Sequence, residues 1–230
     1  MSGQRVAVIG GGPSGLAAAK ACLEVGLQPT VFEKSRKLGG LWKAGKGGLV
    51  WPSLRTNLSR HTCCFSDFIW PEGSPLFPSS AQISEYMEGY GRHFGLERCV
   101  RFGYAVTSVD KDGHGKWRVK FKPSDEARPD MAWIHPEDKK KEEKEEVEWF
   151  ERCIVATGVF SRPSFPPGTH VEGIEEVLGS GTGSVVHCAQ YKGPEPFRGK
   201  VSLVVGCAYS GAEIASGESS RVESSLETVG

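Results

Sequence analysis

Apolar positions first gather in a short run, Val6–Ile9, which leads directly into a group of glycines. The next stretch, Leu16–Val25, is predicted to be a helix that ends at Gly26. A second strand is predicted over Gln28–Phe32, and the acidic residue Glu33 stands at its end. Strand, helix and strand in this order within about 30 residues are typical of a βαβ unit.

The glycines between the first strand and the helix have the spacing G-x-G-x-x-G. In such a turn Gly10 allows the tight bend, Gly12 lets a pyrophosphate approach the backbone, and Gly15 lets the helix pack closely. A carboxylate at Glu33 would accept hydrogen bonds from a ribose. The alternative is a glycine-rich loop without a ligand, which the strand, helix and acidic terminus in register argue against. The candidate dinucleotide-binding residues are Gly10, Gly11, Gly12, Pro13, Ser14, Gly15 and Glu33.

A second helix is predicted over Ala81–Phe94, with Ser80 as its N-cap. Its apolar positions fall on one helical face: Ile83, Tyr86, Met87, Tyr90 and Phe94. Before it, residues 35–80 are rich in Gly, Pro, Ser and Trp and show little periodicity. A loop of that length is expected to carry function or short elements.

The segment after this helix alternates between strand patterns and polar stretches. Tyr104–Val109 and Lys116–Phe121 are predicted to form a hairpin. Residues 122–146 form a polar insertion that ends in a mixed charge run, which is expected to be solvated. Val147–Ala156 is predicted as one strand, followed by Thr157 and Gly158.

A second strand–glycine–helix pattern begins at Val201–Val205 and continues as G-x-A-x-x-G. The alternative is an ordinary strand–helix turn, but beside the first motif the pattern suggests a second cofactor. The tail, residues 217–230, is rich in Ser and Glu and does not resemble the continuation of such a unit. The candidate second-cofactor residues are Gly206, Ala208, Ser210, Gly211 and Glu213.

Composition narrows the function classes. The 28 basic residues balance the 28 acidic ones, so nothing indicates a nucleic-acid partner. No apolar run is long enough for a transmembrane helix, and the glycines and Pro13 interrupt the opening apolar stretch, which argues against a signal peptide. The seven cysteines include no C-x-x-C pair, which favours reduced thiols in the cytoplasm and no metal site.

Together these segments resemble the flavin-containing monooxygenases. His187 and Tyr191 are similar to part of that family's identifier F-x-G-x-x-x-H-x-x-x-Y, although Gly181 stands where the identifier has phenylalanine. The tyrosine favours these enzymes over their Baeyer–Villiger relatives. The other segments that carry the resemblance are Phe32–Lys34, Gly39–Trp42, Leu54–Leu58, Phe65–Phe68, Phe77–Ser79 and Ala156–Gly158.

The resemblance implies FAD and NADP as cofactors and O2 as a co-substrate. NADPH would reduce FAD, and a hydroperoxyflavin would then oxygenate an amine nitrogen or thioether sulfur of a small molecule. Asn57 is the candidate catalytic residue, because its amide can both donate and accept a hydrogen bond. Its alternative is a helix-cap or turn asparagine, and His187 is expected to be structural. The resemblance adds these cofactor-binding candidates: Lys34, Gly40, Leu41, Trp42, Thr56, Asn57 and Gly158.

The fold class implied is α/β. It comprises a Rossmann-like FAD-binding domain over residues 1–175 and the beginning of a Rossmann-like NADPH domain over residues 176–230. Family members are longer, so we expect a truncated chain, associated with the endoplasmic reticulum membrane only if a further C-terminal segment supplies an anchor. One alternative is a non-catalytic flavin- or partner-binding remnant. Another is a flavin disulfide reductase, against which the absent C-x-x-C argues.

Overall fold

A computed structural model describes residues 3–43, 49–124, 144–160, 184–219 and 227–229. Most of the polar insertion and Gly181 therefore lie outside the described residues. The chain divides into two compact units. Unit 1 lies within residues 1–47 and 81–161, and unit 2 within residues 48–80 and 162–230.

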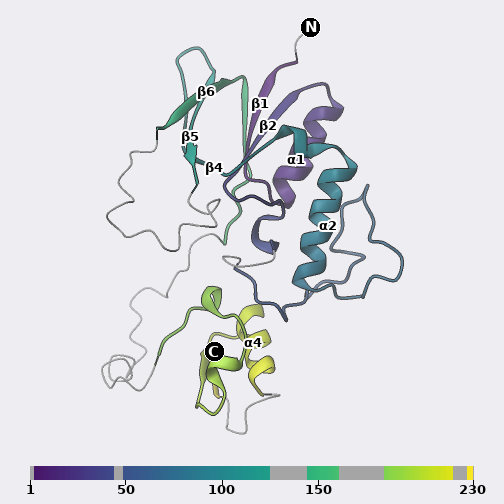
Figure 1. Ribbon diagram of the computed structural model, residues 1–230, viewed down its shortest axis with the longest axis vertical. Coiled ribbons are helices and arrows are strands. Elements are labelled where there is room, and N and C mark those ends of the chain that lie inside the picture. The colour runs from purple at the N-terminus through teal and green to yellow at the C-terminus, as the bar shows by residue number, and fades with distance from the viewer. Residues whose placement is uncertain (1–2, 44–48, 125–143, 161–183, 220–226, 230) are drawn as a thin grey trace. The chain divides into compact units, whose positions relative to one another are not determined.

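The centre of unit 1 is a four-stranded sheet in the order β3-β2-β1-β7. All three strand pairs are parallel. Helix α1 (Pro13–Glu24) joins the first two strands and packs against both of them (Figure 1). This arrangement confirms the predicted βαβ unit and the α/β class. The strands are β1 (Arg5–Ile9), β2 (Gln28–Glu33), β3 (Val100–Phe102) and β7 (Arg152–Val155).

Strand β1 is buried on both faces, which explains its unbroken apolar sequence. Val6 and Val8 point to one face and Ala7 and Ile9 to the other, as the pleat of a strand requires. All four are at most 7% exposed. The fully buried Leu16 contributes to the packing of α1 on the sheet.

The other face of the parallel sheet is covered by a three-stranded antiparallel sheet, β4-β5-β6 (Figure 1). Phe32 of the parallel sheet packs against Phe121 and Phe150 of the antiparallel one, with ring centroids 4.7 and 6.0 Å apart. The predicted hairpin is confirmed by the first two strands. The three are β4 (Tyr104–Lys111), β5 (Trp117–Pro123) and β6 (Glu146–Phe150).

The predicted strand character of residues 147–156 is confirmed, but the run is divided between two sheets. β6 pairs antiparallel with β5, whereas β7 pairs parallel with β1. Glu151 stands at the change of sheet, where its backbone N–H donates to the carbonyl of Arg5 at 3.1 Å. Its carboxylate accepts from the Arg5 backbone N–H at 2.8 Å. Strands of both sheets contain apolar residues, so hydrophobicity alone does not predict the change of sheet at Glu151.

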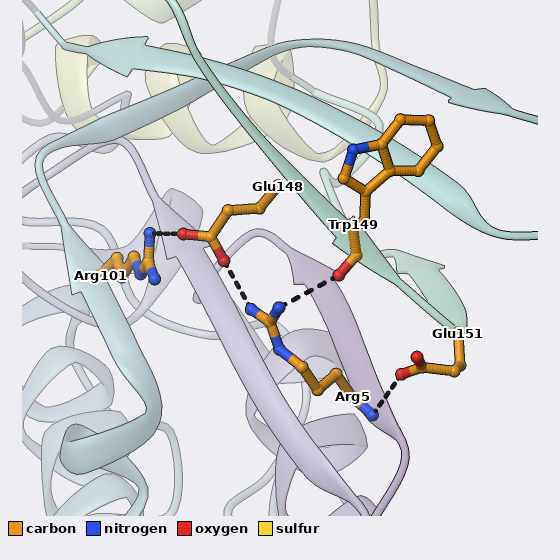
Figure 2. A network of polar contacts seen from close by, with 5 residues as sticks. All are labelled: Arg5, Arg101, Glu148, Trp149 and Glu151. Carbon is orange, nitrogen blue, oxygen red and sulfur yellow. Dashed lines mark hydrogen bonds and ion pairs between the residues drawn. The ribbon is translucent and has the colours of Figure 1, made fainter.

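Side chains of Arg5 in β1, Arg101 in β3 and Glu148 in β6 tie β6 to the parallel sheet (Figure 2). The Glu148 carboxylate lies 2.6 Å from the Arg5 guanidinium and 2.5 Å from that of Arg101. Arg5 also lies 4.6 Å from the ring centroid of Phe150, within cation–π distance. The two sheets are therefore joined by charge as well as by their shared aromatic core.

Helix α2 (Ser80–His93) has the predicted apolar face. Ile83, Tyr86, Met87 and Tyr90 are at most 6% exposed. Ser80 was predicted as the N-cap, but it is the first helical residue, and its hydroxyl lies 3.4 Å from the carbonyl of Trp51. Three-residue and four-residue 3₁₀ helices complete unit 1: η1 (Gly40–Trp42) and η2 (Leu96–Cys99).

Unit 2 contains a second strand–helix–strand unit. β8 (Leu203–Val205) leads to α4 (Tyr209–Ser219), and β9 (Glu227–Val229) pairs parallel with β8. The tail therefore closes a short βαβ unit that its composition did not predict. Unit 2 also has the 3₁₀ helices η6 (Cys188–Gln190) and η7 (Glu195–Phe197). Among the helices described in either unit, none has the length and apolar character to cross a membrane.

Candidate functional site

The turn after β1 has room only for glycine at Gly10 and Gly15. Gly10 has a φ of +109°, and a Cβ there would lie 2.4 Å from the carbonyl oxygen of Ala156. A Cβ at Gly15 would lie 1.9 Å from the carbonyl oxygen of Gly10. The two glycines therefore allow a tight turn between β1 and α1, beside the residue that follows β7, and a close approach of α1 to that turn.

Gly12 is different, because the protein itself would tolerate a side chain there. Its φ is −79°. A Cβ would meet only the Cα of Gly40 at 3.6 Å and its nitrogen at 4.0 Å, which are ordinary contacts. Gly12 also stands immediately before Pro13, where the first turn of α1 leaves N–H groups without intrahelical acceptors. A backbone without a side chain beside such N–H groups allows an anionic pyrophosphate to approach closely.

The helix η1 lies against this turn and brings Gly40, Leu41 and Trp42 to it. The N–H of Gly39 donates to the carbonyl of Gly11 at 3.1 Å. Gly40 has a φ of +57°, and a Cβ on it would approach the Cα of Gly12 to 3.1 Å. The glycine turn and η1, which α1 and β2 separate in the sequence, therefore form one backbone cradle. Leu41 and Trp42 are partly exposed beside it.

Glu33 lies under the glycine turn and is only 5% exposed. Its Oε2 accepts the N–H of Gly11 at 2.7 Å. Its Oε1 accepts both the N–H and the hydroxyl of Ser35, each at 2.8 Å. The neighbouring Lys34 has an exposed side chain. Ser35 was missed from sequence, although a serine two residues after the acidic strand end is in reach of that carboxylate.

The carboxyl ends of the parallel strands bring the predicted residues of unit 1 to one edge of the sheet. Gly10 follows β1, Glu33 ends β2, and Gly158 comes shortly after β7. Gly158 has a φ of +74° and is exposed. Ligands of open α/β sheets bind at this edge.

Thr56 and Asn57 lie in unit 2. The N–H of Thr56 donates to the carbonyl of Pro78 at 2.9 Å, but its buried hydroxyl has no partner among the described residues. The side chain of Asn57 is exposed and forms no hydrogen bond within the described part of the chain. The side chain of Asn57 therefore caps no described helix, and residues 57–58 form a bend. An unpaired buried hydroxyl beside an exposed amide is consistent with a ligand-contacting segment.

The second glycine turn repeats the geometry of the first. Gly206 has a φ of +103°, and a Cβ on Gly211 would lie 1.9 Å from the carbonyl oxygen of Gly206. Ala212 donates its N–H to the carbonyl of Ala208 at 3.0 Å. Ser210 and Glu213 are exposed on this turn and helix. The structure thus brings the second set of predicted residues together at the start of α4.

His187 has a structural role in the described residues. Its Nδ1 accepts the N–H of Ala189 at 3.1 Å, and its own N–H donates to the side chain of Gln190 at 3.3 Å. These bonds form a capping box at the start of η6. The buried Tyr191 follows, with its ring centroid 5.5 Å from that of Trp51.

All seven cysteines are free of disulfide bonds. Burial raises the pKa of the Cys22 and Cys153 thiols. Burial, and then the neighbouring Cys64, raises the pKa of Cys63. A raised pKa disfavours the reactive thiolate, so these three thiols are less reactive than an ordinary cysteine at neutral pH.

Comparisons with known proteins identify the family of this chain. The flavin-binding monooxygenase-like family model matches residues 3–228. The N-oxide-forming dimethylaniline monooxygenase 4 of Rattus norvegicus is 35% identical over 225 residues, which cover 92% of this chain and 35% of that protein. Flavin-containing monooxygenase 1 of Homo sapiens is 35% identical over 226 residues, covering 92% of this chain and 37% of that protein.

A solved structure shows the same likeness in three dimensions. The S-allyl-L-cysteine S-oxygenase of Allium sativum superposes with a TM-score of 0.79 at 26% identity, covering 99% of this chain and 52% of that one. The chain thus spans little more than a third of the two curated relatives and about half of the solved one. The family match over residues 3–228 includes both glycine turns. The chain belongs to the flavin-binding monooxygenase-like family.

Proposed function

We propose that this chain binds FAD and contributes to an FAD- and NADPH-dependent monooxygenase that oxygenates nucleophilic nitrogen or sulfur in small molecules. The observation that carries the proposal is the cradle in which Gly12 faces Gly40, with the carboxylate of Glu33 buried under the same turn. The relatives named above, an N-oxide-forming enzyme and an S-oxygenase, support the substrate class. We assign FAD to a domain over residues 1–175 and NADPH to one that begins over residues 176–230.

The first glycine turn and the residues around it have separate tasks in this proposal. The open space at Gly12 and the N–H groups at the start of α1 receive the pyrophosphate. Glu33 accepts hydrogen bonds from the adenosine ribose, and the backbone of η1 and Gly158 line the flavin half of the ligand. Bound FAD supplies the redox chemistry, taking electrons from NADPH and activating O2. The chain's own residues orient it and exclude water.

Asn57 is the proposed catalytic residue, and Thr56 accompanies it. An exposed amide that forms no hydrogen bond with the described residues is available to donate to one ligand and accept from another. We expect Asn57→Asp to divert O2 to hydrogen peroxide, because a carboxylate lacks the N–H donor. The test measures the product formed per NADPH consumed, together with the hydrogen peroxide released. It uses an enzyme preparation that is catalytically active.

The proposal as a whole is tested by flavin binding. The purified chain is stripped of ligand, titrated with FAD, and then treated with NADPH without oxygen. We expect an oxidised-flavin spectrum that NADPH bleaches, and formation of N-oxide or sulfoxide when air, a tertiary amine or a thioether is added. Failure to bind FAD contradicts the proposal, and FAD binding without reduction favours the non-catalytic alternative.

NADPH is expected to bind more weakly than FAD. Ala208 carries a methyl group at the position where Gly12 has none, and the turn around it is exposed. Calorimetry of both nucleotides on the same preparation measures the difference. Equal affinities would contradict the assignment of the second turn as the weaker site. The proposed setting is the cytoplasm, which agrees with seven cysteines that form no disulfide.

A further inference from the structure

The Glu33 carboxylate is held by three donors, and two of them belong to Ser35. The N–H and the hydroxyl of Ser35 each lie 2.8 Å from Oε1. The N–H of Gly11 lies 2.7 Å from Oε2. Glu33 and Ser35 are 5% and 6% exposed, so little water competes for these bonds. One carboxylate therefore joins the glycine turn to the loop that follows β2.

The backbone of Gly11 fixes the same carboxylate by contact. A Cβ on Gly11 would lie 3.0 Å from Oε2 and 3.1 Å from the Cβ of Glu33. With Gly11 against one oxygen and Ser35 bonded to the other, the plane of the carboxylate cannot turn freely. A ribose hydroxyl that approaches the turn meets acceptors already oriented.

Ser35 has a choice of acceptors that Gly11 lacks. Its Oγ lies 2.7 Å from the carbonyl of Lys37, as well as 2.8 Å from Oε1 of Glu33. A serine hydroxyl carries one proton and can donate to only one of them at a time. Donation to Glu33 satisfies a buried carboxylate when no ligand is present, which avoids the cost of an unpaired buried acceptor. Donation to Lys37 leaves a lone pair of Oε1 available.

We infer that Ser35 is a positioning residue for the adenosine ribose of the dinucleotide. It orients Oε1 of Glu33, and its hydroxyl turns to the Lys37 carbonyl when a ribose hydroxyl takes its place on that oxygen. The inference rests on the proposed function, since it assumes that the first glycine turn binds FAD. No covalent bond is made or broken. Only the direction of one hydroxyl proton, and with it one hydrogen-bond acceptor, changes.

The test compares FAD with an analogue whose adenosine ribose lacks both hydroxyl groups. Ligand-free wild type, Ser35→Ala, Ser35→Thr and Glu33→Gln are titrated with each compound by flavin fluorescence. We expect Ser35→Ala to weaken FAD binding about three- to tenfold, the cost of ordering one side chain on binding, because the carboxylate of Glu33 is then no longer oriented before the ribose arrives. Binding of the analogue should stay unchanged. Ser35→Thr keeps the hydroxyl and should restore the preference for FAD.

A double variant and a matched control sharpen the result. In a Glu33→Ala background, Ser35→Ala should cause no further loss of preference, because both carboxylate oxygens are then absent. Ser108→Ala removes a hydroxyl from an exposed position of β4 in the same unit and should leave both affinities unchanged. The ratio of the two affinities within each variant is the readout, since a general loss of folded protein lowers both alike.

The outcomes separate this inference from the function on which it rests. If wild type prefers FAD over the analogue and Ser35→Ala keeps that preference in full, the role of Ser35 is overturned while FAD binding stands. If Ser35→Ala weakens both compounds equally, Ser35 only supports the loop, and the inference is again overturned. A wild-type chain that binds neither compound overturns the proposed function and this inference together.

Discussion

After β1 the chain turns at Gly10 with a φ of +109°, and after β8 it turns at Gly206 with a φ of +103°. In both turns a Cβ on the later glycine, Gly15 or Gly211, would lie 1.9 Å from the carbonyl oxygen of the first. The first helical hydrogen bonds also match. The N–H of Leu16 donates to the carbonyl of Gly12 at 2.9 Å, and the N–H of Ala212 donates to that of Ala208 at 3.0 Å. The same motif thus produces the same backbone twice.

The surroundings of the two turns differ. Val6 and Val8 of β1 are 1% and 0% exposed, whereas Leu203 and Val205 of β8 are 53% and 57% exposed. β1 has a parallel neighbour on each side, and β8 belongs to a two-stranded sheet. A Cβ on Gly10 would strike Ala156, while one on Gly206 would meet no described atom within 4 Å.

The comparison distinguishes the features that the glycines themselves determine from the features that other parts of the chain must supply. Backbone conformation and helix approach follow from the glycines and are present in both turns. A carboxylate held beneath the turn, a neighbouring strand end and a second backbone segment come from elsewhere in the chain, and they are present around the first turn. A two-stranded sheet alone has marginal stability in water, so the second turn has less to keep it rigid.

The largest expected effect comes from placing a methyl group at Gly15 and at Gly211. Both would strike a backbone oxygen, but the β1 turn is enclosed and cannot relax. We expect Gly15→Ala to lower the free energy of unfolding by about 3 kcal/mol, the upper end of the usual cost of overpacking, and to abolish FAD binding. Gly211→Ala should cost less than about 1 kcal/mol, because an exposed element can distort locally.

Urea unfolding followed by tryptophan fluorescence measures both changes. Gly113→Ala is the control, because a Cβ there meets no described atom within 4 Å and so adds a methyl group without a clash. Equal losses for Gly15→Ala and Gly211→Ala would show that the surroundings of the two turns do not matter.

The next effect concerns the buried carboxylate that only the first turn has among the described residues. Glu33→Ala removes the acceptor of a ligand hydroxyl and should weaken FAD binding by about 1.5–3 kcal/mol, the value of hydrogen bonds to a charged group. Glu213→Ala removes an exposed carboxylate from α4 and should leave FAD affinity unchanged. Flavin titration of the two variants decides, and equal FAD affinity in wild type and Glu33→Ala would remove Glu33 from the site.

Sequence reasoning predicted the local parts of this molecule. The first βαβ unit, the buried face of α2 and the β4–β5 hairpin follow from periodicity and turn residues within short windows. The same reasoning located Gly10, Gly15 and Glu33, since each is needed within one supersecondary unit. These elements and residues depend on contacts between neighbours in the sequence, so short sequence patterns are enough to predict them.

The features that sequence reasoning missed depend on distant partners. The division of residues 147–156 between two sheets follows from the bonds between Arg5 and Glu151, which are far apart in the chain. The contact between Gly12 and Gly40 depends on the path of the loop that follows β2. Strand β9 was missed because its residues do not alternate between apolar and polar. Ser35 was missed because a common turn residue gives no pattern of its own.

A smaller effect separates the packing glycines from the ligand glycine. Gly12→Ala should leave the ligand-free chain as stable as wild type or slightly more stable, because alanine fits the φ of −79° and has fewer unfolded conformations. FAD affinity should fall about tenfold, or about 1.4 kcal/mol, as the methyl group enters the space for the pyrophosphate. Ala208→Gly, the reverse change in the second turn, should not weaken NADPH binding. A Gly12→Ala chain that is strongly destabilised would show that packing, not the ligand, requires this glycine.

The smallest effect tests the corner at Glu151, where the chain passes from the antiparallel sheet to the parallel one. The backbone N–H of Arg5, assisted by the charges of Lys116 and Arg5, lowers the pKa of Glu151 below its ordinary value of 4.5 (Figure 2). A lowered pKa in the folded state means that the carboxylate stabilises the fold above the ordinary value and loses this contribution as pH falls through the folded one. Glu151→Gln should therefore be less stable than wild type at neutral pH and equal to it in acid. Urea midpoints of both proteins across that range measure the difference, with Glu85→Gln on the exposed side of α2 as the control. A difference between wild type and Glu151→Gln that does not change with pH would show that the corner depends on the shape of residue 151 and not on its charge.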